Sequence, residues 1–132
     1  KAFETVCHQH IIMELVQSGV DPHVVHLMGE MYKNIMTSII TKNGKIDPIN
    51  ISSGVEQGDS MSPLLFNLSI DPLLGKLEAE GKGFQHGGFK LTALAFADDL
   101  VLLSDSWEGM CHNIKILETF CKLTGLWTQG EK

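Results

Sequence analysis

Apolar residues recur every three or four positions in four stretches of the chain, which is the period of an amphipathic helix. Asp21 followed by Pro22 marks the start of the second stretch, because aspartate caps a helix and proline suits its first turn. Gly19, Gly81 and Gly125 mark helix ends. We therefore predict four helices, over residues 8–18, 22–34 and 62–80 and from Asp105 or Ser106 to Gly125.

Runs of β-branched and apolar residues, separated by turn residues, predict two hairpins. In the first, over residues 37–51, an Asn-Gly pair between two apolar runs indicates a tight turn, and Pro48 restricts the second strand to a sheet edge. The second joins residues 91–96 to residues 100–104, and both strands are so apolar that we expect both of their faces to be covered. The order helix, helix, hairpin, helix, hairpin, helix predicts an α+β fold, with helices packed on one face of a small antiparallel sheet.

Asp98 and Asp99 stand side by side between the two strands of the second hairpin. Ionised carboxylates are costly to desolvate, and adjacent ones repel each other, unless solvent or a cation faces them. Aspartate also favours turns for local reasons, so a solvated turn is one interpretation. The other is a divalent metal site, because Mg²⁺ prefers oxygen ligands and a turn presents its side chains beyond the sheet. The two carboxylates alone leave both interpretations open.

A second polar segment, GVEQGDSMSPLLFNLSIDPLL over residues 54–74, indicates a loop that leads into a helix opened by Ser62 and Pro63. Gly54 and Gly58 would let the backbone approach a flat ligand or a phosphate closely. A flexible loop is the simpler interpretation of the same two glycines.

The formal net charge of −6 does not suit a nucleic-acid binder, which is normally basic. If the chain handles nucleic acid, the basic residues that neutralise phosphate must lie mostly elsewhere in the protein. The three cysteines are an odd number without a CxxC pair, which indicates reduced thiols rather than a disulfide framework. A zinc site could be imagined from Cys7, His8, His10, His23 and His26. There is no CxxC pair, however, and His23 and His26 fall inside a predicted helix, which favours surface or core packing.

Four segments together resemble the reverse transcriptase family, and they occur in the family's order along the whole chain. FADD at residues 96–99 resembles the family's catalytic carboxylate box. GVEQGDSMSPLLFNL at residues 54–68 resembles its nucleotide- and template-contacting loop and helix. KAFETV at residues 1–6 is similar to the tail of its first carboxylate motif, and GLWTQGEK at residues 125–132 to the start of a later Gly-Leu…Lys motif. The residues of these segments are most similar to those of non-LTR, LINE-type retrotransposon enzymes. Group II intron enzymes are second in similarity.

The resemblance implies a right-hand polymerase, of which these 132 residues are mostly the palm with part of the fingers. It implies RNA-templated DNA synthesis, in which nucleotidyl transfer from a dNTP to a primer 3′-hydroxyl uses two Mg²⁺ ions, or Mn²⁺ in their place. The expected partners are an RNA template, a DNA primer or target and dNTPs, with no membrane, in the nucleus or the cytoplasm. Because Lys1 opens inside a patterned segment, we expect one partial domain of a longer protein.

The resemblance also implies roles for individual residues. Asp98 and Asp99 would hold the metal ions, Asp98 more directly, with Phe96 and Ala97 beside them in the same motif. Phe3 matches the aromatic residue that packs under the incoming sugar and excludes a 2′-hydroxyl. The remaining matches are Gln57 and Gly58, which would line the nucleotide and template site, Ser62 and Pro63, which would start the helix behind it, and Lys132, which would lie near the triphosphate as a proton donor to pyrophosphate.

Three departures from the family pattern matter. The family's first metal-binding Asp stands three residues before the Lys-Ala-Phe and would precede Lys1, so we expect these residues alone not to catalyse. Glu4 stands where this lineage usually has Asp, and Gln129 where it usually has Asn, and neither is a predicted metal ligand. Two other interpretations stay open. One is a decayed or domesticated palm that acts as a nucleic-acid-binding or interaction module. The other is an RNA-templated RNA polymerase. Phe3 and residues 54–74 are less similar to the motifs of that class.

Overall fold

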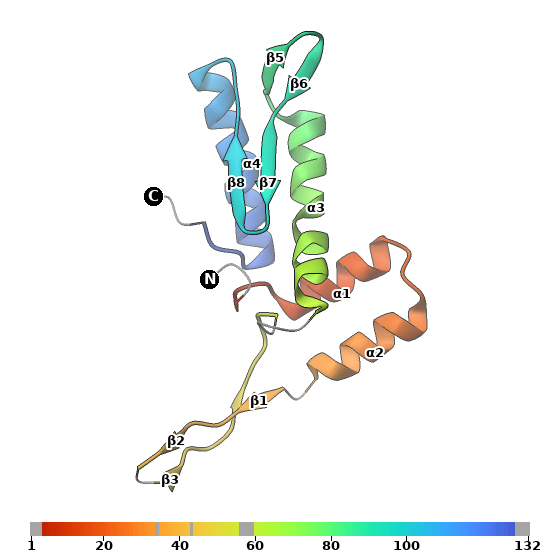
Figure 1. The fold of residues 1–132 in the computed structure, drawn as a ribbon, viewed down its shortest axis with the longest axis vertical. Helices are drawn as coiled ribbons and strands as arrows, with labels where there is room; N and C mark the ends of the chain where they lie inside the picture. The colour runs from red at the N-terminus through yellow and green to blue at the C-terminus, as the bar shows by residue number, and fades with distance from the viewer. Residues whose placement is uncertain (1–3, 34, 43, 56–59, 129–132) are drawn as a thin grey trace.

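The computed structural model describes residues 4–33, 35–42, 44–55 and 60–128. Helices and short antiparallel strands follow one another along the chain, in agreement with the predicted α+β class (Figure 1). Among these residues, no helix has both the length and the apolar composition needed to cross a membrane. The elements are α1 (His8–Gln17), α2 (Pro22–Tyr32), β1 (Met36–Thr37), β2 (Ile40–Thr41), β3 (Gly44–Lys45), β4 (Ile49–Asn50), α3 (Ser62–Glu80), β5 (Phe84–His86), β6 (Phe89–Leu91), β7 (Ala93–Phe96), β8 (Asp99–Leu102) and α4 (Trp107–Thr124).

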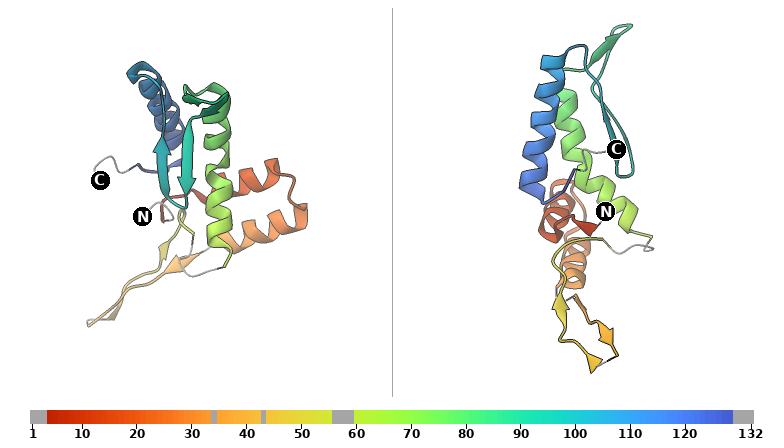
Figure 2. Two further views of the ribbon diagram at one scale, coloured as in Figure 1. Left: turned by 45° about the horizontal axis from the view of Figure 1, so that its top comes forward. Right: turned by 90° about the vertical axis from the view of Figure 1, so that its left-hand side faces the viewer.

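Helices α3 and α4 pack side by side, and the β7–β8 hairpin lies against both of them (Figure 1, Figure 2). Leu73 and Leu77 from α3 are buried together with Ile116 from α4. Apolar residues of the hairpin, among them Leu100 and Leu102, pack against this cluster. Burial of these side chains between two helices and a hairpin fixes where the turn between β7 and β8 lies.

A second core lies where α1 and α2 meet the first half of α3. On α1 and α3, burial follows the helical period that the sequence predicts. On α2 it does not, because Met28 is buried whereas Val24, Leu27 and Met31 are exposed. Phe66 of α3 is 2 % exposed and Ile11 of α1 is fully buried. The buried members are Val6, Ile11, Leu15, Met28, Val55, Leu65 and Phe66.

The helix ends follow the capping residues of the sequence. The Asp21 carboxylate accepts a hydrogen bond from the backbone N–H of His23 at 2.8 Å, as an N-cap does. The Ser106 hydroxyl accepts one from the N–H of Gly109 at 3.1 Å, which selects Ser106 over its acidic neighbour as the cap of α4. Gly19 and Gly125 close α1 and α4 with φ values of 74° and 76°. Helix α2 ends two residues before the predicted boundary.

The first predicted hairpin is confirmed as a long, thin arm that extends from the two helical cores (Figure 1). Strand β1 pairs with β4 and β2 pairs with β3, and Pro48 lies where the pairing is interrupted. Thr41 pairs with Gly44, so the glycine of the Asn-Gly pair is a paired strand residue with φ 125° and not a central residue of the turn. Every residue of these four strands is exposed.

Two expectations about the sheets are wrong. The described strands form four separate two-stranded sheets and not one sheet. A further hairpin, β5–β6, precedes β7, and its turn consists of Gly87 and Gly88, with φ values of 56° and 84°. The Gly-Gly pair between His86 and Phe89 suits the left-handed backbone of such a turn, so the sequence carried a signal for it.

The strands β7 and β8 are covered on one face only, contrary to the expectation that both faces are buried. Leu94, Phe96 and Val101 are 52 %, 84 % and 52 % exposed, whereas Leu100 and Leu102 turn toward α3 and α4. The apolar composition therefore did not distinguish a doubly covered strand from one whose outer face is apolar and open.

Candidate functional site

The two adjacent carboxylates lie at the tip of the β7–β8 hairpin. Phe96 pairs with Asp99, so Ala97 and Asp98 are the two residues of the turn. Ala97 has φ 51°, a left-handed conformation that costs a residue with a Cβ about 1–2 kcal/mol. The packed strands on either side hold the turn in this conformation and project its side chains beyond the end of the sheet.

Solvent access explains how two acidic side chains can stand between two apolar strands. Asp98 and Asp99 are both exposed, so neither carboxylate is transferred out of water. Asp99 also shares the outer face of the hairpin with its cross-strand partner Phe96. Exposed carboxylate oxygens on adjacent residues are suitable ligands for a hard cation such as Mg²⁺.

The donor set supplied by the described residues is incomplete for a dedicated metal site. Within them, no group of three or more His, Cys, Asp or Glu side chains is placed to share a metal ion. Asp98 and Asp99 fit a divalent cation as two of its ligands, and the substrate or another part of the protein has to supply the rest.

A small cavity of about 80 Å³ lies beneath the turn. Its walls include Ala97, Asp98 and Asp99 from the turn, apolar residues of α3 and α4, and Trp127 from the segment that follows α4. Cys121 of α4 also lines it, and burial, with a smaller contribution from the charge of Glu118, raises the pKa of the Cys121 thiol. The turn thus rests on a mainly apolar floor, and burial in it disfavours the thiolate form of Cys121.

The other described candidate residues lie at the start of α3. Ser62 and Pro63 occupy its first turn, as predicted, with Ser62 buried and Pro63 exposed. Ser62 lines a groove of about 590 Å³ together with Glu4 and Gly54. The described candidates are therefore in two places, the hairpin tip and this groove, and neither of these two cavities contains both sets. Phe3, Gln57, Gly58 and Lys132 lie outside the described residues, as does Gln129.

A backbone pairing between the segment before α1 and the segment after β4 was missed from the sequence. Cys7 and Ser53 form an antiparallel bridge, and the N–H of Gly54 donates to the carbonyl oxygen of Val6 at 2.8 Å. Gly54 has φ 93°, and a Cβ there would come within 2.9 Å of the Glu4 carbonyl oxygen. The close approach that the sequence suggested for Gly54 is therefore to the protein's own backbone.

The histidines considered for a zinc site have other contacts. His8 and His10 are each 7 % exposed, whereas His23 and His26 lie on the exposed surface of α2. Nε2 of His8 donates to the carbonyl oxygen of Gly54, and Nε2 of His10 to that of Ser69, both at 2.8 Å. The predicted packing role is confirmed for these two buried rings.

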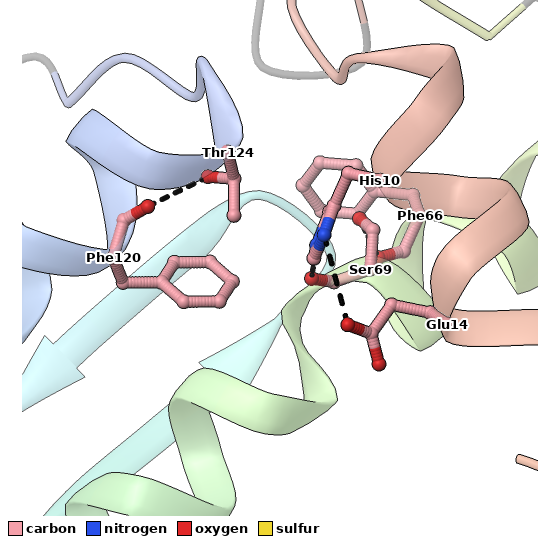
Figure 3. Close-up of polar contacts among 6 residues, drawn as sticks. All are labelled: His10, Glu14, Phe66, Ser69, Phe120 and Thr124. Atoms are coloured by element: carbon pink, nitrogen blue, oxygen red, sulfur yellow. Dashed lines mark hydrogen bonds and ion pairs between the residues drawn. The ribbon is translucent and has the colours of Figure 1, made fainter. Parts of the chain in front are cut away.

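Figure 3 shows how His10 links three helices. Its ring bonds the backbone of Ser69 on α3, and its Nδ1 lies 3.6 Å from a carboxylate oxygen of Glu14 on α1. The ring meets Phe120 of α4 edge-on, with 5.8 Å between the ring centroids. Phe120 and Phe66, both drawn in this view, line the cavity beneath the carboxylate turn. The His10 ring thus packs against one of the aromatic residues that line that cavity, Phe120.

Comparisons with known proteins agree with the motifs. The family described as "Reverse transcriptase (RNA-dependent DNA polymerase)" matches residues 1–132. The chain is 37 % identical over 133 residues to the retrovirus-related Pol polyprotein of the type-1 retrotransposable element R2 of Popillia japonica, covering all of the chain and 22 % of that protein. It is 36 % identical over 126 residues to the R2 protein of Nasonia vitripennis, covering 96 % of the chain and 12 % of that protein.

A third relative, the Pol polyprotein of the type-2 element R2DM of Drosophila melanogaster, is 33 % identical over 132 residues, which is all of the chain and 12 % of that protein. The chain thus spans between about an eighth and about a fifth of the length of these curated relatives. The match across the whole chain agrees with the resemblance of its four segments to non-LTR elements. The chain belongs to the reverse transcriptase family.

Proposed function

We propose that the chain is the palm and part of the fingers of an RNA-directed DNA polymerase from an R2-like, non-LTR retrotransposon. The observation that supports this most directly is the β7–β8 hairpin, which presents Asp98 and Asp99 to solvent on a packed base in a chain of this family. The site takes an RNA template, a DNA primer or target and dNTPs. We also propose that the chain is one partial domain of a longer protein, because it spans only 12 % and 22 % of two curated relatives. That protein would act in the nucleus or the cytoplasm.

Asp98 and Asp99 would hold Mg²⁺, or Mn²⁺ in its place, and bound divalent ions would stabilise charge on the attacking and leaving oxygens of the transferred phosphate. The chain's own contribution is position. The strands β7 and β8 hold the two carboxylates at the hairpin tip, where a third carboxylate from before Lys1 would complete the set. These residues alone would not catalyse without that third ligand.

The remaining roles concern the nucleotide. Phe3 would pack under the incoming sugar and exclude a 2′-hydroxyl, while Gln57 and Gly58 would line the nucleotide and template site. Ser62 and Pro63 start α3 at the groove of about 590 Å³, which we assign to the nucleotide side of the site. Lys132 would donate a proton to the leaving pyrophosphate.

The acidic charge fits a palm that gathers carboxylates for metal, provided that other parts of the protein hold the nucleic acid. With a net charge of −6, this chain supplies little of the phosphate neutralisation that a template needs. We propose that the flanking regions of the complete protein are basic. An acidic flank would contradict a template-binding enzyme.

The test is dNTP incorporation on a primed RNA template by the full-length source polypeptide. Asp98→Ala should abolish incorporation, by at least about 1,000-fold, because it removes a carboxylate that holds metal. Its melting temperature should stay near that of the wild type, because the side chain is exposed. Asp47→Ala, which removes an exposed carboxylate from the arm, is the matched control and should keep full activity.

Two outcomes would contradict the proposal. Wild-type activity in Asp98→Ala would remove the carboxylate turn from the chemistry. A folded wild-type polypeptide that binds primed template but incorporates no dNTP would favour the decayed or domesticated palm.

A further inference from the structure

Two segments that are distant in the sequence are joined side by side just before α1 and just after β4. The N–H of Gly54 donates to the carbonyl oxygen of Val6 at 2.8 Å, and the N–H of His8 donates to that of Ser52 at 3.4 Å. We call residues 4–8 and 52–55, joined in this way, the clamp. Val6 is fully buried and Val55 is 4 % exposed, so the clamp is anchored in the core at both of its strands.

The side chain of His8 closes the clamp. A carbonyl oxygen can only accept, so Nε2 of His8 carries the hydrogen of its 2.8 Å bond to Gly54. The face of the ring is fixed as well, because it stacks on Tyr32 of α2 with 4.2 Å between ring centroids and 19° between ring planes. A ring held both in its plane and on its face has one position, and it fixes the carbonyl of Gly54 with it.

The clamp borders the nucleotide side of the proposed site. Glu4, Tyr32, Gly54 and Val55 line the groove of about 590 Å³ that also contains Ser62. Along the chain, the clamp leads on one side to Phe3, which directly precedes Glu4. On the other side it leads to Gln57, two residues after Val55. The sequence thus attaches both nucleotide-contacting candidates to the two strands that His8 ties together.

We infer that His8 is a positioning residue for nucleotide binding, acting through Gly54 and Tyr32 on the wall of this groove. The inference rests on the proposed function. His8 does not contact substrate, because its donor atom is used by Gly54 and its ring face by Tyr32. Loss of the ring lets the segment at residues 52–55 shift relative to the segment at residues 4–8. Substrate affinity and sugar discrimination therefore change more than the chemical step.

The chain supplies a matched control two residues further along the same helix. His10 has the same exposure of 7 % and the same 2.8 Å bond from Nε2 to a carbonyl oxygen, but its partner is Ser69 of α3 and not the clamp. His8→Ala and His10→Ala therefore remove the same ring and the same kind of hydrogen bond. They differ in which part of the molecule is released.

The experiment measures dNTP KM and kcat, and the ratio of rNTP to dNTP incorporation, for both variants in the full-length source polypeptide. His8→Ala should raise the dNTP KM about tenfold and increase the rNTP share, with kcat within about threefold of the wild type. His10→Ala should leave the dNTP KM within about twofold of the wild type, whatever its effect on melting temperature. His8→Gln, whose amide can donate to Gly54, should recover most of the KM.

If His8→Ala does not fold, Tyr32→Leu takes its place, because it removes the stacking surface and leaves the hydrogen bond of His8 intact. It should raise the dNTP KM in the same direction by a smaller factor. Equal KM values in the His8 and His10 variants, or no rescue by His8→Gln, would overturn the positioning role while Asp98→Ala still shows the proposed chemistry. A wild-type polypeptide without incorporation would overturn the proposed function, and this inference with it.

Discussion

The β7–β8 hairpin, which carries the carboxylate turn, and the arm are both antiparallel, but they are held in place differently. The β7–β8 hairpin packs on α3 and α4, where Leu77 is fully buried and Leu100 and Leu102 lie against the same cluster. The arm, β1 to β4, has only exposed residues in its strands, and Ile40 is 82 % exposed. Hydrogen bonds between its own strands are what maintain it.

Chemistry that needs fixed geometry is better supported by the β7–β8 hairpin than by the arm. A turn on a packed base keeps its side chains in place, whereas a hairpin with few buried contacts opens locally at little cost. Asp98 and Asp99 are on the first kind of hairpin.

Removing one side chain from each hairpin should change the free energy of unfolding by very different amounts. Leu77→Ala should lower the free energy of unfolding by about 3–5 kcal/mol, because the vacated space lies between two helices and a hairpin and cannot collapse. Ile40→Ala removes a side chain of similar size from the arm and should cost at most about 0.5 kcal/mol. Urea denaturation of the two variants measures both values. Similar losses of unfolding free energy in the two variants would show that the arm is packed as well as the β7–β8 hairpin.

Sequence patterns predicted the elements better than their packing. The four helices and both expected hairpins are present, because caps, glycine stops and apolar period are local properties. The number of separate sheets and the open outer face of β7–β8 depend on neighbours that a single strand's composition does not specify.

Asn113 shows what periodicity cannot reveal. It lies on α4 beside the apolar stripe, is fully buried, and bonds both the N–H and the carbonyl of Lys82, at 2.8 and 3.1 Å. Its amide also donates to the carbonyl oxygen of Leu103 at 3.2 Å. This one side chain ties α4 to the segment before β5 and to the segment after β8, and its partners become visible only in three dimensions.

The candidate site divides in the same way. The place of the carboxylate pair at the tip of a hairpin was predictable, since an acidic dipeptide stands between two apolar runs. The clamp closed by His8 was not, because its partners, Gly54 and Tyr32, are 46 and 24 positions away and no pattern links them. Buried histidines were correctly assigned to packing, but which segments they pack together is a property of the fold.

A smaller effect distinguishes the tips of the two hairpins. Ala97, at the carboxylate turn, has φ 51°, so Ala97→Gly should relieve strain and raise the free energy of unfolding by up to about 1 kcal/mol. In the arm, Gly44 already has a positive φ of 125°, and Gly44→Ala should be destabilising by about 1 kcal/mol or less, because the arm opens easily. Thermal unfolding of both variants measures the changes. A destabilised Ala97→Gly would show that the turn does not hold alanine under strain.

The packed base of the β7–β8 hairpin should also shield the Cys121 thiol from solvent, and this effect is small. Burial raises the pKa of the Cys121 thiol beneath the carboxylate turn, so at pH 8 less of it is thiolate, the form that reacts. A thiol reagent should therefore modify Cys121 about threefold or more slowly than Cys111, which is exposed on the same helix. Cys111→Ser and Cys121→Ser variants separate the two rates by mass spectrometry. The sign of the pH dependence follows, because a raised pKa shifts the rise in the rate of Cys121 to higher pH. In urea the two rates should converge, whereas equal rates in the folded protein would mean that solvent enters the cavity freely and that the floor of the turn is as open as the arm.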